Sequence, residues 1–178
     1  MKRSKVPIVP KLIASKKPLL IAITGTPCTG KSKLAKQLSL LLNAKHLNLN
    51  KIALQRGLRL GFDRQRQASI INEKGLYRII KPLLRPNKVY ITDSHLSHYL
   101  PSSKVSFCIV ARCNLKTLKN RLKRRKYNPA KIAENIEAEA LGICFGEAKE
   151  FGHNVIEIDC TKPISKPKLK QILRQVRT

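Results

Sequence analysis

Residues 25–32 have the types and the spacing of a phosphate-binding loop. They read GTPCTGKS, which fits the pattern G-x-x-x-x-G-K-[ST]. In this pattern consecutive backbone N–H groups surround a phosphate, the lysine reaches the β- and γ-phosphates, and the last hydroxyl ligates Mg²⁺. We therefore predict that Lys31 binds ATP and that Ser32 binds Mg²⁺. We interpret Cys28 as a small residue within the loop, because no group that would activate a thiol lies beside it in the sequence.

A second group of reactive residues follows the apolar stretch at residues 89–91. Asp93 ends this stretch, where an acidic side chain can hold Mg²⁺ next to the loop serine, although it can also simply cap the following turn. His95 stands two residues later, and an imidazole with a pKa near neutral can orient or deprotonate a water that faces the γ-phosphate. His95 and His98 form an H-x-x-H pair. Because no further ligand lies at matching spacing, we predict a structural role for His98 and no zinc site.

Basic residues crowd the end of a predicted helix at residues 115–125. Five of the six residues from 121 to 126 are Lys or Arg, and a Tyr-Asn-Pro turn follows them. One interpretation is a solvated basic helix end. We favour a lid that closes over the triphosphate and brings an arginine, Arg125, to the charge that develops during phosphoryl transfer.

The elements that must position these residues alternate between apolar strands and helices. We predict strands at 19–23, 44–48, 89–91, 105–110 and 154–159, and helices at 32–42, 51–58, 73–84 and 115–125, for about twenty residues from 129, and at 163–175. This order predicts an α/β fold with a five-stranded parallel sheet. Residues 48–71 combine a short helix with a loop, and an insertion there would receive a second substrate.

The composition is strongly basic. With 37 Lys and Arg against 10 Asp and Glu, the formal net charge is +27, which favours a polyanionic partner such as RNA. We expect residues 1–17 to form a flexible basic arm and residues 18–178 to form a single domain. Five scattered cysteines and the absence of a long apolar run favour a cytoplasmic protein without disulfides or a membrane span, or a nuclear one if the source is eukaryotic.

Three stretches together resemble the adenylate kinase isoenzyme 6 family, P-loop proteins of archaea and eukaryotes. These are ITGTPCTGKS at residues 23–32, YITDSH at 90–95 and RLKRRKYNPAKIAENIEAE at 121–139. The resemblance covers about residues 18–160. It implies a P-loop NTPase three-layer sandwich like that of nucleoside monophosphate kinases, which acts as an adenylate kinase and ATPase in small ribosomal subunit maturation.

The resemblance also implies sites and partners. The ATP-binding residues would be Cys28, Gly30, Lys31, Ser32, Lys33 and Arg125, and the D-x-H motif would be Asp93 and His95. A monophosphate-binding segment at about residues 48–71 would take AMP, and a lid would occupy about residues 124–134. The cofactors would be ATP and Mg²⁺. The partners would be a small-subunit ribosomal protein and pre-rRNA, with the chain a monomer or a weak oligomer.

This sequence departs from the family at several positions. Cys28 stands where the family generally has glycine, Lys33 stands where it has threonine or serine, and basic or amide residues replace carboxylates at 64–66 and at Asn72. Two alternatives therefore stay open. One is a basic RNA- or ribosome-binding nucleotide switch with weak or no kinase activity, and the other is a kinase for a different small acceptor.

Overall fold

A computed structural model of the chain describes residues 17–64 and 68–175. The predicted basic arm at residues 1–17 lies outside this part of the chain except for Lys17, and so do three residues of the predicted monophosphate-binding segment. No helix among the described residues is long and apolar enough to cross a membrane.

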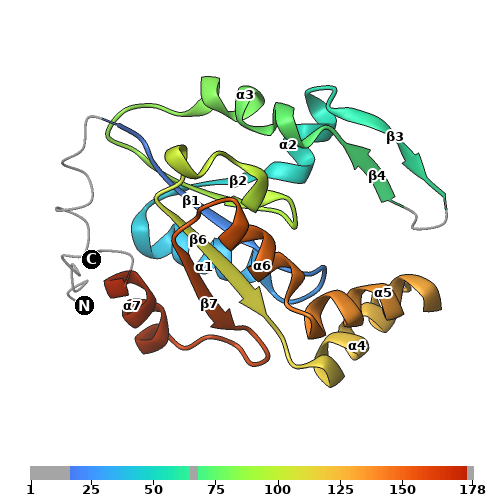
Figure 1. Cartoon of the computed structure of the whole chain (residues 1–178). Helices are drawn as coiled ribbons and strands as arrows, with labels where there is room; N and C mark the ends of the chain where they lie inside the picture. The colour runs from blue at the N-terminus through green and yellow to red at the C-terminus, as the bar shows by residue number, and fades with distance from the viewer. Residues whose placement is uncertain (1–16, 65–67, 176–178) are drawn as a thin grey trace.

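Five parallel strands form the centre of the molecule (Figure 1). Their order across the sheet is β2-β5-β1-β6-β7, so β1 is the middle strand. The strands are β1 (Leu19–Thr24), β2 (Lys45–Asn48), β5 (Val89–Asp93), β6 (Phe107–Arg112) and β7 (Val155–Asp159). The predicted five-stranded parallel sheet is confirmed.

Helices cover both faces of this sheet and make the fold a three-layer sandwich. The helices are α1 (Lys31–Leu42), α2 (Leu49–Gln55), α3 (Leu76–Ile80), α4 (Leu115–Arg124), α5 (Pro129–Ala140), α6 (Ile143–Glu150) and α7 (Lys166–Gln175). Alternate residues of β1 point to opposite faces. Ile21 and Ile23 pack with α1 and α7, whereas Leu20 and Ala22 pack in a second core with α2, α3 and α6.

Residues 59–71 differ from the sequence-based expectation of a loop. They form an antiparallel hairpin of β3 (Arg59–Asp63) and β4 (Ala68–Ile71), separate from the main sheet. Leu60, Phe62 and Ile70 are exposed on it. In β3, Leu60 and Phe62 do alternate with polar residues and glycine, but β4 reads ASII and does not alternate. An alternation over only five residues, one of them glycine, is too short to identify a strand.

Two predicted helices are interrupted. The helix expected at residues 73–84 is helical only over Leu76–Ile80, with a 3₁₀ turn on each side, the second of which contains Pro82. The helix expected from residue 129 breaks at Gly142, whose left-handed backbone (φ 67°) ends α5 and starts α6 on a new axis.

The phosphate-binding loop leaves β1 through a backbone conformation that only glycine adopts readily. Gly25 has a φ of 133°, and a Cβ atom built on it would lie 2.4 Å from the carbonyl oxygen of Ala111 in β6. The loop therefore starts in direct contact with the neighbouring strand, and any side chain at this position would push the two apart.

We expect Gly25→Ala to lower the free energy of unfolding by about 3 kcal/mol or more, because it combines backbone strain with a clash against backbone atoms. The matched control is Gly146→Ala in α6, where a Cβ atom meets nothing within 4 Å. This control should raise the free energy of unfolding by about 0.5–1 kcal/mol, because alanine favours a helix interior more than glycine does. Urea denaturation of both variants measures the difference. Equal effects would mean that the loop does not need glycine at its first position.

Candidate active site

The phosphate-binding loop joins the end of β1 to the start of α1, as its pattern predicts. Lys31 is the first residue of α1, and its Nζ donates a hydrogen bond to the carbonyl oxygen of Thr26 at 2.8 Å. Burial lowers the pKa of Lys31 to about 8, even though the negative charge of Asp93 opposes the shift. An anion bound beside Lys31 would therefore stabilise the charged form of this half-buried amine.

Ser32 and Asp93 meet because β1 and β5 are neighbours in a parallel sheet and their carboxyl ends share one edge. Ser32 Oγ donates to Asp93 Oδ2 at 2.5 Å. The other carboxylate oxygen, Oδ1, lies 2.5 Å from Nε2 of His46 in β2. A hydroxyl and a carboxylate are the hard oxygen donors that Mg²⁺ prefers, so this pair fits the ion, and His46 holds the carboxylate in place.

His95 lies beyond the end of β5, on the wall of the cavity that contains the loop. His95 is exposed toward this cavity, but the groups around its ring desolvate it and lower its pKa to about 4, and the positive charges of Lys31 and Lys131 add to this shift. The expectation of a pKa near neutral is therefore wrong. At neutral pH the imidazole is uncharged, and its free nitrogen can accept a hydrogen bond from a water molecule.

Two arginines at the basic end of α4, Arg121 and Arg125, lie in different environments. Arg121 is bound to backbone oxygens, with Nη1 donating to Thr29 at 2.8 Å and Nη2 donating to Cys160 at 3.0 Å and to Thr161 at 2.8 Å. This arginine joins the phosphate-binding loop to the segment after β7. Arg125 follows the last residue of α4, is exposed, and lines the cavity together with Arg124. Arg125 is thus available to a bound anion, whereas Arg121 is engaged with the protein.

Glu139 connects the loop to α5 and β6. Its carboxylate is 3% exposed; Oε2 accepts from Thr26 Oγ1 at 2.6 Å, and Oε1 accepts from Arg112 Nε at 3.0 Å and from the backbone N–H of Cys113 at 2.8 Å. Arg112 also donates through Nη1 to Glu157 at 2.7 Å. Nothing in local spacing identified this buried carboxylate, because its partners lie 26 to 113 residues away in the sequence.

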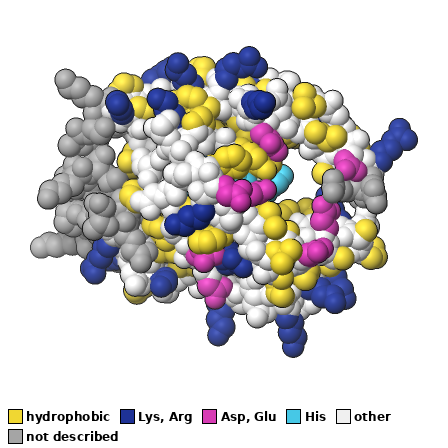
Figure 2. All heavy atoms as spheres, viewed as in Figure 1, with side chains coloured by type: hydrophobic (Ala, Val, Ile, Leu, Met, Phe, Trp, Pro, Cys, Tyr) yellow, Lys and Arg dark blue, Asp and Glu magenta, His cyan; other side chains and the backbone are white. Residues whose placement is uncertain are grey.

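One cavity of about 1080 Å³ contains the candidate site, and Figure 2 shows the surface hollowed where the β3–β4 hairpin faces the α5 side. All eight residues selected from the sequence line it: Cys28, Gly30, Lys31, Ser32, Lys33, Asp93, His95 and Arg125. Their individual roles stay predictions. The cavity is also lined by Asn48, Asn50, Leu54, Ala68, Ser69 and Ile71, from β2, α2 and the hairpin. Asn48 pairs with Asp93 across the sheet, so this further lining begins directly beside the predicted site.

The departure at Cys28 has a backbone explanation. Cys28 has a φ of 70°, which is the left-handed region that favours glycine. Its side chain packs beside a small cluster formed by Cys113, Leu118 and Leu122. The loop therefore keeps a glycine-like conformation with cysteine in it, and contact with this cluster offsets part of the strain.

Solved structures share the fold at low sequence identity. The chain matches the structure of deoxyadenosine kinase from M. mycoides with bound dATP with a TM-score of 0.54 and 15% identity, covering 90% of this chain and 100% of that one. It matches a shikimate kinase from Bacteroides thetaiotaomicron with a TM-score of 0.54 and 12% identity, covering 89% and 96%. These matches agree with a P-loop kinase fold.

Sequence relatives are much more similar. A protein of Pyrococcus furiosus named "Putative adenylate kinase" is 36% identical over 160 residues, which are 90% of this chain and 85% of that protein. A Methanosarcina barkeri protein with the same name is 37% identical over 145 residues, covering 80% and 78%. A family described as "AAA domain" also matches residues 21–142. The chain therefore belongs to this adenylate-kinase-like family of P-loop proteins.

Proposed function

We propose that this protein is a Mg²⁺-dependent adenylate kinase that converts ATP and AMP to two ADP, hydrolyses ATP in the same site, and acts in the maturation of the small ribosomal subunit. The observation that carries the proposal is the cavity itself. It extends from a phosphate-binding loop and a Ser32–Asp93 pair to lining residues of α2 and of the β3–β4 hairpin, which leaves space for a second substrate. The names of the relatives support adenylate as the acceptor.

The donor side has the groups that phosphoryl transfer requires. Backbone N–H groups at the start of α1 and the Lys31 ammonium favour the phosphates of ATP. Ser32 and Asp93 would hold Mg²⁺, which supplies positive charge to the transferred phosphoryl group. Arg124 and Arg125 line the same cavity and add positive charge where negative charge develops.

The acceptor side is built differently. Asn48, Asn50 and Ser69 present amides and a hydroxyl, and Leu54 and Ile71 present apolar surface. Asn50 is held by Ser94, whose Oγ donates to Asn50 Oδ1 at 2.6 Å. Such a mixture suits a nucleoside, whose base needs an apolar surface and whose edges need hydrogen-bonding groups.

Kinase activity depends on Lys31 in this proposal. Lys31→Ala should lower both ADP formation from ATP with AMP and ATP hydrolysis by at least about a hundredfold, because it removes the cation that contacts the transferred phosphate. Lys36→Ala is the matched control, since Lys36 is an exposed lysine of the same helix and does not line the cavity. A coupled assay comparing ATP alone, ATP with AMP and ATP with other small acceptors measures this. A rate increase with another acceptor but none with AMP would replace adenylate kinase by the alternative small-molecule kinase.

His95 distinguishes hydrolysis from transfer. His95→Ala should lower ATP hydrolysis more than transfer to AMP, because a neutral imidazole orients a water, whereas AMP carries its own nucleophile. Since the pKa of His95 is about 4, the ratio of wild-type to variant hydrolysis should stay constant between pH 6 and pH 8, with the wild-type imidazole uncharged throughout. Measurement of both activities across this pH range tests both expectations. Equal losses of the two activities would contradict the assigned role.

The ribosomal part of the proposal rests on charge and on the resemblance to the isoenzyme 6 family. A net charge of +27 favours contact with RNA phosphates, and Figure 2 shows Lys and Arg side chains at the upper and lower borders of one face. The same charge supports the alternative of an RNA-binding nucleotide switch, which differs from the leading proposal by the lack of kinase turnover.

We expect the affinity for small-subunit rRNA to fall steeply with added salt, with a slope of log K against log salt of about −4 or steeper, because several phosphate contacts each release counterions. Filter binding at a series of salt concentrations measures the slope. Binding that is absent or does not change with salt would contradict electrostatic association with RNA.

A further inference from the structure

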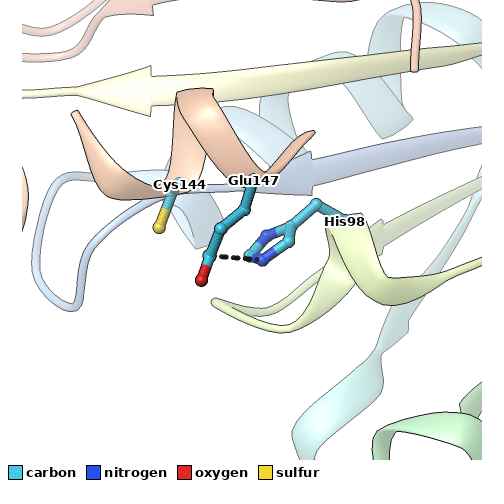
Figure 3. A group of neighbouring side chains, drawn as sticks. All are labelled: His98, Cys144 and Glu147. Atoms are coloured by element: carbon cyan, nitrogen blue, oxygen red, sulfur yellow. Dashed lines mark ion pairs between the residues drawn. The ribbon is translucent and has the colours of Figure 1, made fainter. Parts of the chain in front are cut away.

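His98, Cys144 and Glu147 lie together on the side of α6 that faces the turn after β5 (Figure 3). His98 belongs to a 3₁₀ turn at Ser97–Tyr99, and the other two residues are three positions apart on α6, so they share one face of the helix. One ligand atom from each of the three side chains lies within 4.8 Å of the other two. Among the residues that the structure describes, this is the only group of three or more His, Cys, Asp or Glu side chains with such spacing.

Two of the three side chains have an outer partner that orients them. Nδ1 of His98 lies 2.6 Å from Oγ1 of Thr24. The Tyr99 hydroxyl donates to Glu147 Oε1 at 3.4 Å. Groups that hold the ligand side chains in this way are typical of metal sites, in which they set the tautomer of histidine and the direction of carboxylates.

The Thr24 contact is compatible with a His98 that can bind a metal ion. Thr24 Oγ1 lies 2.6 Å from Nδ1 of His98 and 3.4 Å from the carbonyl oxygen of His95. In the tautomer in which Nδ1–H donates to Thr24, Nε2 presents a lone pair. This is the arrangement in which a neutral histidine binds a metal ion.

Nε2 of His98 is buried and has no hydrogen-bond partner. His98 is 1% exposed, and its Nε2 lies 2.9 Å from Glu147 Oε2, a contact that would be an ion pair only if the imidazole were protonated. A buried ring nitrogen without a hydrogen bond, next to a carboxylate oxygen, can be satisfied by a cation between the two atoms. The thiol of Cys144 lies near these two side chains, since ligand atoms of all three residues lie within 4.8 Å of one another (Figure 3).

We propose that His98, Cys144 and Glu147 form a second divalent-cation site, and that the ion it takes is Zn²⁺. One nitrogen, one sulfur and one oxygen ligand suit zinc, whereas the pair at Ser32 and Asp93 offers only the oxygen donors that suit Mg²⁺. Three protein ligands leave a fourth position of a tetrahedral ion for water or another small ligand. None of the three residues lines the nucleotide cavity, so the two sites are separate.

An ion at this site would join α6 to the turn at Ser97–Tyr99. Nδ1 of His98 contacts Oγ1 of Thr24, which is the last residue of β1 and directly precedes the phosphate-binding loop. The site therefore supports the rear of the loop, on the side away from the nucleotide, and zinc should stabilise the folded chain.

The test uses the full chain without a purification tag and without nucleotide. Zinc titration in competition with a chromophoric chelator should show one ion per chain, and Co²⁺ in its place should show a thiolate-to-cobalt charge-transfer band. Cys144→Ser and Glu147→Gln should each weaken zinc binding by about tenfold or more, and Cys144→Ser should remove the band. Both ligands lie on the partly exposed side of the site, so these variants are preferred to changes at buried His98.

The matched controls are the same two types of substitution, Cys→Ser and Glu→Gln, at residues outside the proposed site. Cys113→Ser removes a thiol elsewhere, and Glu150→Gln removes a carboxylate from the same helix. Both should bind zinc as the wild type does, and zinc should raise the thermal midpoint of the wild type and the controls but not that of Glu147→Gln. Absence of zinc binding, a cobalt complex without the thiolate band, or equal affinity in Glu147→Gln and Glu150→Gln would overturn the proposal. None of these outcomes depends on kinase activity, so the proposed function is tested separately.

Discussion

The buried carboxylate of Glu139 connects the parts of the nucleotide site. It accepts hydrogen bonds from the loop, from the Arg112 side chain and from the backbone just after β6. Removing one member of such a buried charged network leaves other groups unpaired, which typically costs about 3–5 kcal/mol. Because α5 begins just after Arg125, this one side chain relates the position of the basic α4–α5 turn to that of the phosphate-binding loop.

Arg121 makes the same connection from the other side. Its guanidinium contacts backbone oxygens of the loop and of the segment after β7, so the loop is held between two charged side chains from consecutive helices. A loop held in this way presents its N–H groups in one arrangement. Preorganised dipoles of this kind stabilise developing charge without being reoriented during the reaction.

The phosphate-binding loop also packs against β6 on the side away from the nucleotide cavity. Gly25 packs directly against β6, and Thr24 just before it contacts His98, which adjoins α6. A movement of α6 could therefore alter the position of the loop through His98, Cys144 and Glu147, none of which lines the nucleotide cavity. The phosphate-binding loop thus lies between two chemically different groups of possible metal ligands. Ser32 and Asp93 offer oxygen atoms only, whereas the other group also offers nitrogen and sulfur.

Most of the fold and the centre of the donor site followed from local patterns. The strand, loop and helix around residues 25–32 were predictable because parallel-strand residues are continuously apolar and the loop motif has fixed spacing. Asp93 was found for the same reason, since it ends an apolar strand. The hairpin at residues 59–71 was missed, because its strands have only five and four residues, contain Gly61, and alternate between apolar and polar residues in β3 alone.

The sequence by itself thus determined the five strands of the main sheet, the phosphate-binding loop and the basic charge. Only the tertiary structure decided which distant residues meet. It paired His46 with Asp93, placed Glu139 beneath the loop, and brought Cys144 and Glu147 to His98 across more than forty residues. It also set the low pKa of His95, since desolvation on the cavity wall and neighbouring lysines, rather than residue type, lower that value. Local spacing reports contacts within one helix or strand, whereas these contacts arise where separate elements pack together.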